Sequence, residues 1–279
     1  MTPVPFSLSE RTGDPLSRRP KPRVGRGPYD RRMNNINDAK IAITGGTSGL
    51  GLALVRELLG RGARVAFVAR TRAHVEAVAR AHPDAYGIVG DVARKDDIYP
   101  MALQIAGNLG GLDVLVNNAS SLGPTPLQLL GDTACEDFEL ALATNVLGPF
   151  RLTKALLGAL AASAREGRGS IVLNISSDAA VNAYPHWGAY GASKAALAHM
   201  SRIWDEELAG TGIRFLALDP GDMDTPLHAL AAPDADRATL KRPETAAREL
   251  ADAIAAALPA RLGLAVQAPV SAALEEIRA

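Results

Sequence analysis

The chain has 279 residues, of which 47% are hydrophobic, and its 30 basic and 30 acidic side chains leave no formal net charge. This length suffices for one large α/β domain, and no apolar run approaches the roughly 20 residues of a membrane-spanning helix. The single cysteine, Cys135, excludes an intrachain disulfide and is typical of a reducing compartment, and the five histidines show no metal-ligand spacing. We therefore expect a cytoplasmic protein with no metal site and no contact with a membrane.

The first 32 residues differ from the rest in composition. They carry eight Lys or Arg, only three acidic residues and six prolines. Such a segment has too little apolar surface to offset the entropy lost on ordering. We expect a disordered basic arm over 1–38, ahead of a domain over 39–279. The arm lacks the apolar core of a signal peptide, Met33 is a second candidate start of translation, and nucleic acid is not an expected partner.

From residue 39 onward, short apolar runs alternate with longer stretches of helical periodicity. The apolar runs predict strands at 41–43, 64–69, 85–89, 113–116, 170–175 and 213–218, with 262–266 as a candidate last strand. The stretches between them predict helices at 52–59, 73–81, 94–107, 134–163 and 188–209, and a final helix after Pro243.

Runs that are apolar on both faces and separated by helices predict a parallel sheet covered on both sides. Right-handed crossovers make this a single-domain, doubly wound α/β fold of the Rossmann type, with three layers in the order α/β/α. The Pro- and Asp-rich stretch 219–242 interrupts the alternation. We expect it to form a mobile loop above the carboxyl ends of the strands, where ligands bind in such sheets.

A glycine-rich turn directly follows the first predicted strand and reads T-G-G-T-S-G-L-G over residues 44–51. Glycine permits a tight turn and a close approach of the backbone to a ligand, and the N-terminus of the next helix attracts phosphate. The strand–turn–helix context favours a dinucleotide site over a plain structural turn. The expected contacts are Gly45, Thr47, Ser48, Gly49, Leu50 and Gly51.

Arg70 ends the second predicted strand, nineteen residues past Gly51. An NAD site places a carboxylate near this point for the adenosine ribose, whereas a guanidinium matches the 2′-phosphate of NADP. We expect a preference for NADP(H), and the alternative is an arginine that is simply solvated.

Tyr190 and Lys194 are spaced by four residues on a predicted helix, and Ser177 precedes Tyr190 by thirteen. Positions i and i+4 share one face, so the phenol and the ammonium can point into one cleft. A free tyrosine has a pKa of about 10, so acid/base catalysis near pH 7 requires its pKa to fall by about three units, or about 4 kcal/mol. One ammonium at about 4–6 Å supplies about 3–4 kcal/mol at an effective dielectric constant of about 20. We expect hydride transfer coupled to proton transfer through Tyr190.

Several motifs in order resemble those of the short-chain dehydrogenase/reductase family, in its compact single-domain branch. They are the glycine turn, Asp91-Val92 after the third strand, Asn117-Asn118-Ala119-Ser120 after the fourth, Asn145 in Thr144-Asn145-Val146, Ser177 with Tyr190 and Lys194, and Pro220-Gly221 with Thr225. The resemblance covers about residues 39–266. It departs from the family at Ser120, where glycine is usual, at the insertion 161–169, and at the C-terminus, which lacks the V-D-G-G ending.

The resemblance implies a role for each matching residue. Tyr190 would be the general acid/base, Lys194 would also bind the nicotinamide ribose, and Ser177, rather than its neighbour Ser176, would bind the substrate oxygen. Asn145 would complete the catalytic set, and Pro149 four residues later independently frees its backbone carbonyl to hold a water. The further cofactor contacts implied are Asp91, Val92, Asn118, Ala119, Pro220, Gly221 and Thr225.

The sequence therefore predicts an NADPH-dependent oxidoreductase that acts on a small carbonyl compound or secondary alcohol. The resemblance implies a homodimer or homotetramer. A catalytically silent NADP(H)-binding sensor or scaffold is the alternative. Tyr184, His186, Trp187 and Asp178 either border the substrate pocket or pack and cap the loop, and the sequence does not identify the substrate.

Overall fold

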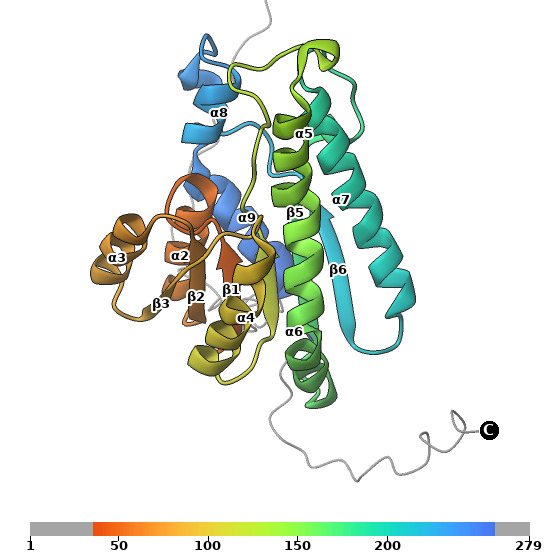
Figure 1. Ribbon diagram of the computed structural model, residues 1–279. Coiled ribbons are helices and arrows are strands. Elements are labelled where there is room, and N and C mark those ends of the chain that lie inside the picture. The colour runs from red at the N-terminus through yellow and green to blue at the C-terminus, as the bar shows by residue number, and fades with distance from the viewer. Residues whose placement is uncertain (1–35, 260–279) are drawn as a thin grey trace, which may run out of the picture.

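The computed structural model describes residues 36–259 as one layered α/β unit (Figure 1). Six parallel strands form a single sheet in the order β3-β2-β1-β4-β5-β6. The strands are β1 (Lys40–Thr44), β2 (Arg64–Ala69), β3 (Ala85–Val89), β4 (Val114–Asn117), β5 (Ser170–Ile175) and β6 (Ile213–Leu218). The order reverses between β1 and β4, which is the hallmark of a doubly wound sheet. The predicted fold class is confirmed.

Helices cover both faces of this sheet, and each face has its own core. The helices are α2 (Gly49–Gly60), α3 (Arg72–Ala81), α4 (Lys95–Leu109), α5 (Cys135–Leu142), α6 (Gly148–Arg165), α7 (Gly188–Glu207), α8 (Pro226–Ala231) and α9 (Pro243–Ala257). Side chains of α2, α3 and α9 pack on one face, and those of α4, α6 and α7 pack on the other (Figure 1). No helix in residues 36–259 is long and apolar enough to cross a membrane.

The predicted long helix 134–163 is interrupted where Asn145 lies. The chain forms α5, then a π-helical turn over Ala143–Leu147, and then α6, with Pro149 in the first turn of α6. Proline has no N–H to donate to the carbonyl four residues earlier, so the ordinary helical pattern cannot continue through this point. The predicted single helix is therefore wrong, because a wider turn that contains Asn145 divides it into α5 and α6.

The stretch 219–242 contains a helix that the sequence analysis did not predict. Thr225 caps α8 by accepting a hydrogen bond from the backbone N–H of His228 at 3.2 Å, and Pro226 occupies the first helical position. Both are strong local start signals for a helix. Because α8 has only six residues, it is too short to show a periodic pattern of hydrophobic residues. Figure 1 shows it beyond the carboxyl ends of the strands.

Two expectations for the ends of the chain fall mainly outside the described residues, namely the arm up to residue 35 and the candidate strand 262–266. Ile36, inside the predicted arm, is fully buried in the core against α2 and α9. The packed unit thus begins by residue 36.

The insertion 161–169 is held at the amino ends of the strands, away from the glycine turn. Asp113 precedes β4 and is 2% exposed. Its carboxylate accepts two hydrogen bonds from the Arg168 guanidinium at 2.8 and 3.1 Å, one from the Lys40 N–H at 2.9 Å, and one from the Ser163 hydroxyl. A buried carboxylate requires such partners, so this cluster ties the end of α6 to β1 and β4.

Candidate active site

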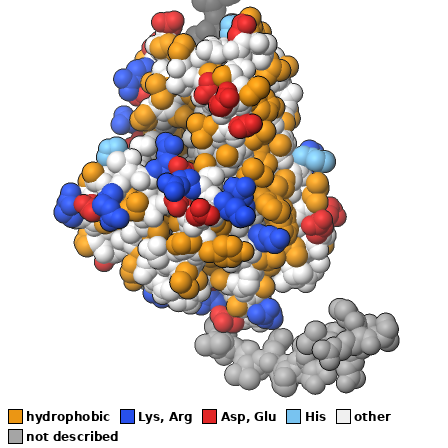
Figure 2. All heavy atoms as spheres, in the orientation of Figure 1, with side chains coloured by type: hydrophobic (Ala, Val, Ile, Leu, Met, Phe, Trp, Pro, Cys, Tyr) orange, Lys and Arg blue, Asp and Glu red, His pale blue; other side chains and the backbone are white. Residues whose placement is uncertain are grey.

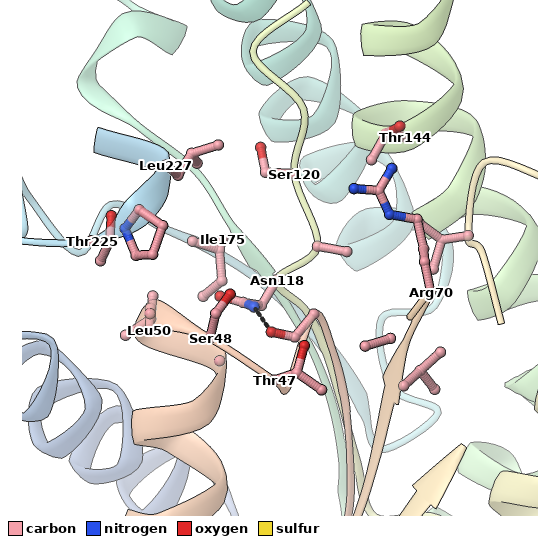
Figure 3. Close-up of a pocket in the computed structure, with 18 of the residues that line it drawn as sticks. Thr47, Ser48, Leu50, Arg70, Asn118, Ser120, Thr144, Ile175, Thr225 and Leu227 are labelled. Atoms are coloured by element: carbon pink, nitrogen blue, oxygen red, sulfur yellow. Dashed lines mark hydrogen bonds between the residues drawn. The ribbon is translucent and has the colours of Figure 1, made fainter. Parts of the chain in front are cut away.

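A cavity of about 440 Å³ opens at the carboxyl ends of β1, β2, β4 and β5, where the strand order reverses (Figure 3). Twelve of the residues predicted from the sequence for catalysis or cofactor binding line it. They are Gly45, Thr47, Ser48, Gly49, Leu50, Gly51, Arg70, Val92, Asn118, Ala119, Lys194 and Thr225.

The glycine turn forms one wall of this cavity and its geometry requires glycine. Gly45 and Gly49 have φ angles of +72° and +50°, which other L-residues adopt at a cost. A Cβ on Gly51 would lie 2.1 Å from the carbonyl oxygen of Gly45, so no side chain fits there. The Ser48 side chain makes no capping hydrogen bond. The first amides of α2 therefore remain available to an anion in the cavity.

Asn118 and Thr44 fasten the glycine turn to the segment after β4. The Thr44 hydroxyl accepts hydrogen bonds from the N–H groups of Asn118 and Ala119, both at 3.0 Å. The Asn118 amide donates in return to the Thr44 carbonyl at 2.8 Å and more weakly to that of Gly45 at 3.4 Å (dashed line in Figure 3). In this structure Asn118 thus shapes the cavity by holding two loops together.

Arg70 extends from the end of β2, and its guanidinium reaches toward Thr144 across the cavity (Figure 3). No ion pair or hydrogen bond joins this side chain to any other residue within 36–259. Arg70 also borders a neighbouring groove that contains Asp91. The Asp91 carboxylate accepts a hydrogen bond from the Ala93 N–H at 3.0 Å, so it caps its own turn.

Tyr190 and Lys194 lie on the buried face of α7, as their spacing predicted. Tyr190 is 8% exposed and Lys194 is 2% exposed. The Lys194 ammonium lies 5.4 Å from the centre of the Tyr190 ring and donates a hydrogen bond of 2.7 Å to the Ile175 carbonyl at the end of β5. Ser177 and Ser120, which follow β5 and β4, lie near the Tyr190 phenol and favour its ionised form, which acts to lower its pKa.

The ionisation of these two groups is dominated by burial. Burial raises the pKa of Tyr190 to about 12, the carboxylates of Asp219 and Asp178 act in the same direction, and the nearby hydroxyls of Ser177 and Ser120 oppose them. Burial also lowers the pKa of Lys194 to about 8, against the attraction of Asp219. The expected lowering of the Tyr190 pKa by Lys194 is not found, because desolvation of the phenol outweighs a cation that faces the ring and binds a backbone carbonyl.

Asn145 is 1% exposed and joins three parts of the site. Its side-chain oxygen accepts hydrogen bonds from the Ser121 N–H at 2.8 Å and the Ser120 hydroxyl at 3.2 Å. Its amide donates to the Ser121 carbonyl and to the Ser193 hydroxyl, both at 2.8 Å, and Ser193 donates to the Tyr190 carbonyl at 2.7 Å. The side chain of Asn145, placed by the π-helical turn, thus links the loop after β4 to α7.

A buried polar chain fixes α7 against the sheet below the site. The Asn117 amide donates to the side-chain oxygen of Asn174 at 2.8 Å, and the Asn174 amide donates to the Ser201 hydroxyl at 2.8 Å. Ser201 donates to the Leu197 carbonyl one turn earlier, at 2.7 Å. Because α7 carries Tyr190 and Lys194, these bonds set their height above β4 and β5.

The structure also shows which residues the sequence analysis left out. Ser120 was noted only as a departure from the family, yet it lines the cavity and acts to lower the pKa of Tyr190. Its position in the segment that follows β4 could have identified it, because ligands bind beyond the carboxyl ends of the strands. The cavity further includes His74, Thr144, Ile175, Met223, Leu227 and Leu230. Six of the predicted residues do not line it, namely Asn145, Ser177 and Tyr190 of the catalytic set and the cofactor candidates Asp91, Pro220 and Gly221.

The aromatic residues between Ser177 and Tyr190 border a second cavity of about 490 Å³, next to Leu129 and Leu130. Trp187 packs edge-on against Tyr190, with ring centres 5.6 Å apart. Tyr184 and His186 are exposed. Within residues 36–259 there is no group of three or more His, Cys, Asp or Glu side chains that could hold a metal ion.

The cavity fits a dinucleotide. A glycine turn lines it, with no room for a side chain at Gly51, and a helix N-terminus without a side-chain cap faces it. Arg70, which has no partner within residues 36–259, stands at one end, and Lys194 beside Tyr190 stands at the other. This donor set matches a pyrophosphate between two nucleoside ends.

Comparison with known proteins agrees with this geometry. Residues 39–236 match the family model of short chain dehydrogenases. The chain is 35% identical over 190 residues to 2-(R)-hydroxypropyl-CoM dehydrogenase of Xanthobacter autotrophicus, covering 66% of this chain and 74% of that protein. It resembles a 3-ketoacyl-(acyl-carrier-protein) reductase from Brucella melitensis complexed with NADH, with a TM-score of 0.72 and 26% identity over 77% of this chain and 90% of that one. It also resembles an actinorhodin polyketide ketoreductase with NADPH, with a TM-score of 0.70 and 27% identity over 78% and 90% of the two chains.

The family model covers well over half of the chain, and its match coincides with the glycine turn, the cavity and the Tyr190–Lys194 pair. The protein therefore belongs to the short-chain dehydrogenase/reductase family and is an NAD(P)-dependent oxidoreductase that acts on alcohol or carbonyl groups.

Proposed function

We propose that this protein is an NADP(H)-preferring oxidoreductase that interconverts a carbonyl compound and its secondary alcohol, with Tyr190 as the general acid/base. The observation that carries the proposal is the buried Tyr190 phenol, which lies near two serine hydroxyls and beside the ammonium of Lys194, a residue that lines this end of the cavity. A bound nicotinamide would supply or accept the hydride at that end.

The proton chemistry follows from the site's own residues. Because burial keeps the pKa of Tyr190 near 12, the phenol is protonated at neutral pH, which is the form that a proton donor needs during carbonyl reduction. Ser177 would hold the substrate oxygen beside this phenol. Lys194, with a pKa of about 8, is a group from which Tyr190 could recover its proton near neutral pH. Asn145 would hold the loop after β4 and α7 in register for this transfer.

The preference for NADP(H) rests on Arg70. Its guanidinium is free of protein partners within the described residues and reaches into the cavity, as a ligand for a 2′-phosphate must. The proposed contacts of the remaining cofactor are the amides of the glycine turn and residues Val92, Ala119 and Thr225.

Two variants test these roles. Tyr190→Phe should abolish turnover of a carbonyl and alcohol panel while leaving NADPH binding intact, because only the proton donor is lost. Arg70→Asp should reverse the preference from NADP⁺ to NAD⁺, since a carboxylate repels the 2′-phosphate and accepts hydrogen bonds from the ribose hydroxyls. Full activity of Tyr190→Phe would refute the role of the phenol. An unchanged ratio of dissociation constants, measured by calorimetry for Arg70→Asp, would refute the cofactor preference.

We also propose that the chain assembles as a homodimer through α5, α6 and α7. Leu140 of α5, Leu147 of the π-helical turn before α6 and Ile203 of α7 are 43%, 41% and 45% exposed, and Phe150 of α6 contacts Trp204 of α7. Figure 2 shows hydrophobic side chains along α5 and α6 on this face. Light scattering on Leu147→Glu should show monomers where the unmodified chain shows dimers or tetramers, and a monomeric unmodified chain would contradict the proposal.

A further inference from the structure

The Tyr190 side chain belongs to a small apolar cluster that is separate from the two cores of the sheet, and we call it the Tyr190 cluster. Leu122, in the loop after β4, and Ala179, after β5, are buried in it together with Tyr190. Four partly buried hydrophobic side chains pack against these three, namely Leu127, Trp187, Leu227 and Ala231. The loop after β4, the stretch before α7, and α8 thus all place apolar groups against the reacting residue.

The Tyr190 cluster borders both cavities, although Tyr190 itself lines neither. Leu227 also lines the cavity that fits a dinucleotide, at the end away from Arg70 (Figure 3), whereas Ala179 and Trp187 border the second cavity. Leu227 is thus the member of the cluster that lies next to the proposed cofactor. A substrate that meets the phenol beside the cofactor must therefore displace Leu227, which belongs to the six-residue helix α8.

The cations near the Tyr190 cluster are already occupied. Each of the three Lys and Arg side chains in 219–242, the segment that carries α8, lies 2.7, 2.8 or 3.7 Å from a carboxylate, in the pairs Arg237–Asp224, Lys241–Glu249 and Arg242–Glu244. Among the described residues that line the two cavities, the Lys and Arg side chains are Arg70, at the far end, and Lys194. Lys194 is buried and donates to the Ile175 carbonyl at 2.7 Å, and the Asp178 carboxylate lies 3.1 Å from the Ser177 hydroxyl. An anionic group on a substrate would meet apolar side chains and a carboxylate here.

We propose that the substrate is an uncharged ketone or secondary alcohol with an apolar substituent, and that this substituent displaces Leu227 and packs against Leu122, Leu127 and Trp187. The inference rests on the proposed function and names its substrate class. Moving Leu227 aside uncovers apolar surface of the cluster, and an apolar substituent covers that surface again. A carboxylate, sulfonate or phosphate in the same place would lose its hydration without gaining a partner.

Matched ketones test the proposal in the NADPH-dependent reaction. For unbranched methyl ketones from 2-butanone to 2-octanone, kcat/KM should rise about fourfold with each methylene until the apolar site is filled. Acetophenone should exceed 4-acetylbenzoate by at least about 100-fold in kcat/KM, because the two compounds differ only in a carboxylate that has to be buried without a partner. Equal values for this pair, or a higher value for the anion, would overturn the proposal.

Two arginine variants show whether the Tyr190 cluster sets this preference. Leu127→Arg places a cation at the apolar wall, and because Leu127 is only partly buried, the longer side chain can extend its charged end to water. It should reduce the preference for acetophenone over 4-acetylbenzoate at least about tenfold. Val181→Arg is the control, because Val181 is 85% exposed and lies outside the cluster, and it should change the preference less than about twofold. Equal effects of the two variants would refute the role of the cluster.

Binding separates this inference from the proposed function. In Tyr190→Phe saturated with NADPH the ketones should not react, so their dissociation constants can be measured by saturation-transfer NMR. Acetophenone should bind at least about 100-fold more tightly than 4-acetylbenzoate, and binding without a preference would overturn the inference. If the unmodified protein turns over no ketone but this preference is present, the proposed function is refuted and the apolar, uncharged ligand class is supported. Turnover of both compounds at equal rates refutes the substrate class alone.

Discussion

Asp113 should be one of the most sensitive positions of the fold, although it lies at the end of the sheet opposite the active site. The change Asp113→Ala removes a carboxylate that is 2% exposed and accepts hydrogen bonds from Arg168, Ser163 and the Lys40 backbone. Truncating one partner of a buried charged cluster costs about 3–5 kcal/mol, because the remaining donors lose the charged acceptor in a place that water reaches poorly. The free energy of unfolding should fall by that amount.

A second aspartate provides a matched control. Asp205 accepts two hydrogen bonds from the Arg214 guanidinium, at 2.9 and 3.2 Å, and one from the Phe215 N–H at 2.8 Å, but its side chain is 29% exposed. Water can replace the lost partner there, so Asp205→Ala should cost only about 1 kcal/mol. Urea denaturation of both variants at equal protein concentration measures the difference. Equal losses would refute the reasoning that burial, rather than the number of hydrogen bonds, sets the cost.

The same cluster predicts a pH dependence. Burial opposes ionisation of Asp113, but the hydrogen bonds from Arg168, Ser163 and Lys40 prevail and hold its pKa below the ordinary value. A carboxyl group whose folded-state pKa is lowered stabilises the protein above its unfolded-state pKa of about 4, and this contribution is lost as the pH falls through the folded-state value. The difference in unfolding free energy between the unmodified chain and Asp113→Asn should therefore narrow below about pH 4. A difference that stays constant down to acid unfolding would contradict this assignment.

Two further predictions concern the active site. Lys194→Met should abolish turnover yet raise the free energy of unfolding at pH 7 by about 2 kcal/mol, a net value that allows for the lost hydrogen bond to Ile175. The reason is that burial lowers the lysine pKa to about 8, so the folded chain bears a desolvated charge below that pH. This stabilisation should shrink as the pH rises from 8 toward 10.5, and urea denaturation at pH 7 and 9.5 measures the change. Gly51→Ala should weaken NADP⁺ binding at least about 100-fold, or about 3 kcal/mol, because the added Cβ would lie 2.1 Å from the Gly45 carbonyl oxygen. Gly60→Ala, in the same helix, is the control: its Cβ would have no neighbour within 4 Å, so the dissociation constant measured by calorimetry should not change.

Much of the fold could be predicted from the chain alone because the relevant information is local. Strand 213–218 coincides with β6, and strands 64–69 and 85–89 coincide with β2 and β3, since short apolar runs bounded by helices can hardly be anything else in a parallel sheet. The long helix was the main misjudgement. Its periodicity continues through Asn145, and only the backbone shows that Pro149 widens the turn into a π-helix rather than bending one continuous helix.

The sequence by itself determined the chemistry that is available to this protein: a glycine turn after a strand, an arginine at the end of the next strand, and Tyr190 and Lys194 on one helix face. These features depend on neighbours within a few residues, and local geometry follows from local sequence. The tertiary structure alone decided how the groups act. Ser120 lies near Tyr190 although 70 residues of chain separate them, burial raises the pKa of the phenol instead of lowering it, and Asn145 joins the loop after β4 to α7. Burial and contacts between distant segments arise only when strands and helices pack, so no local sequence pattern could predict them.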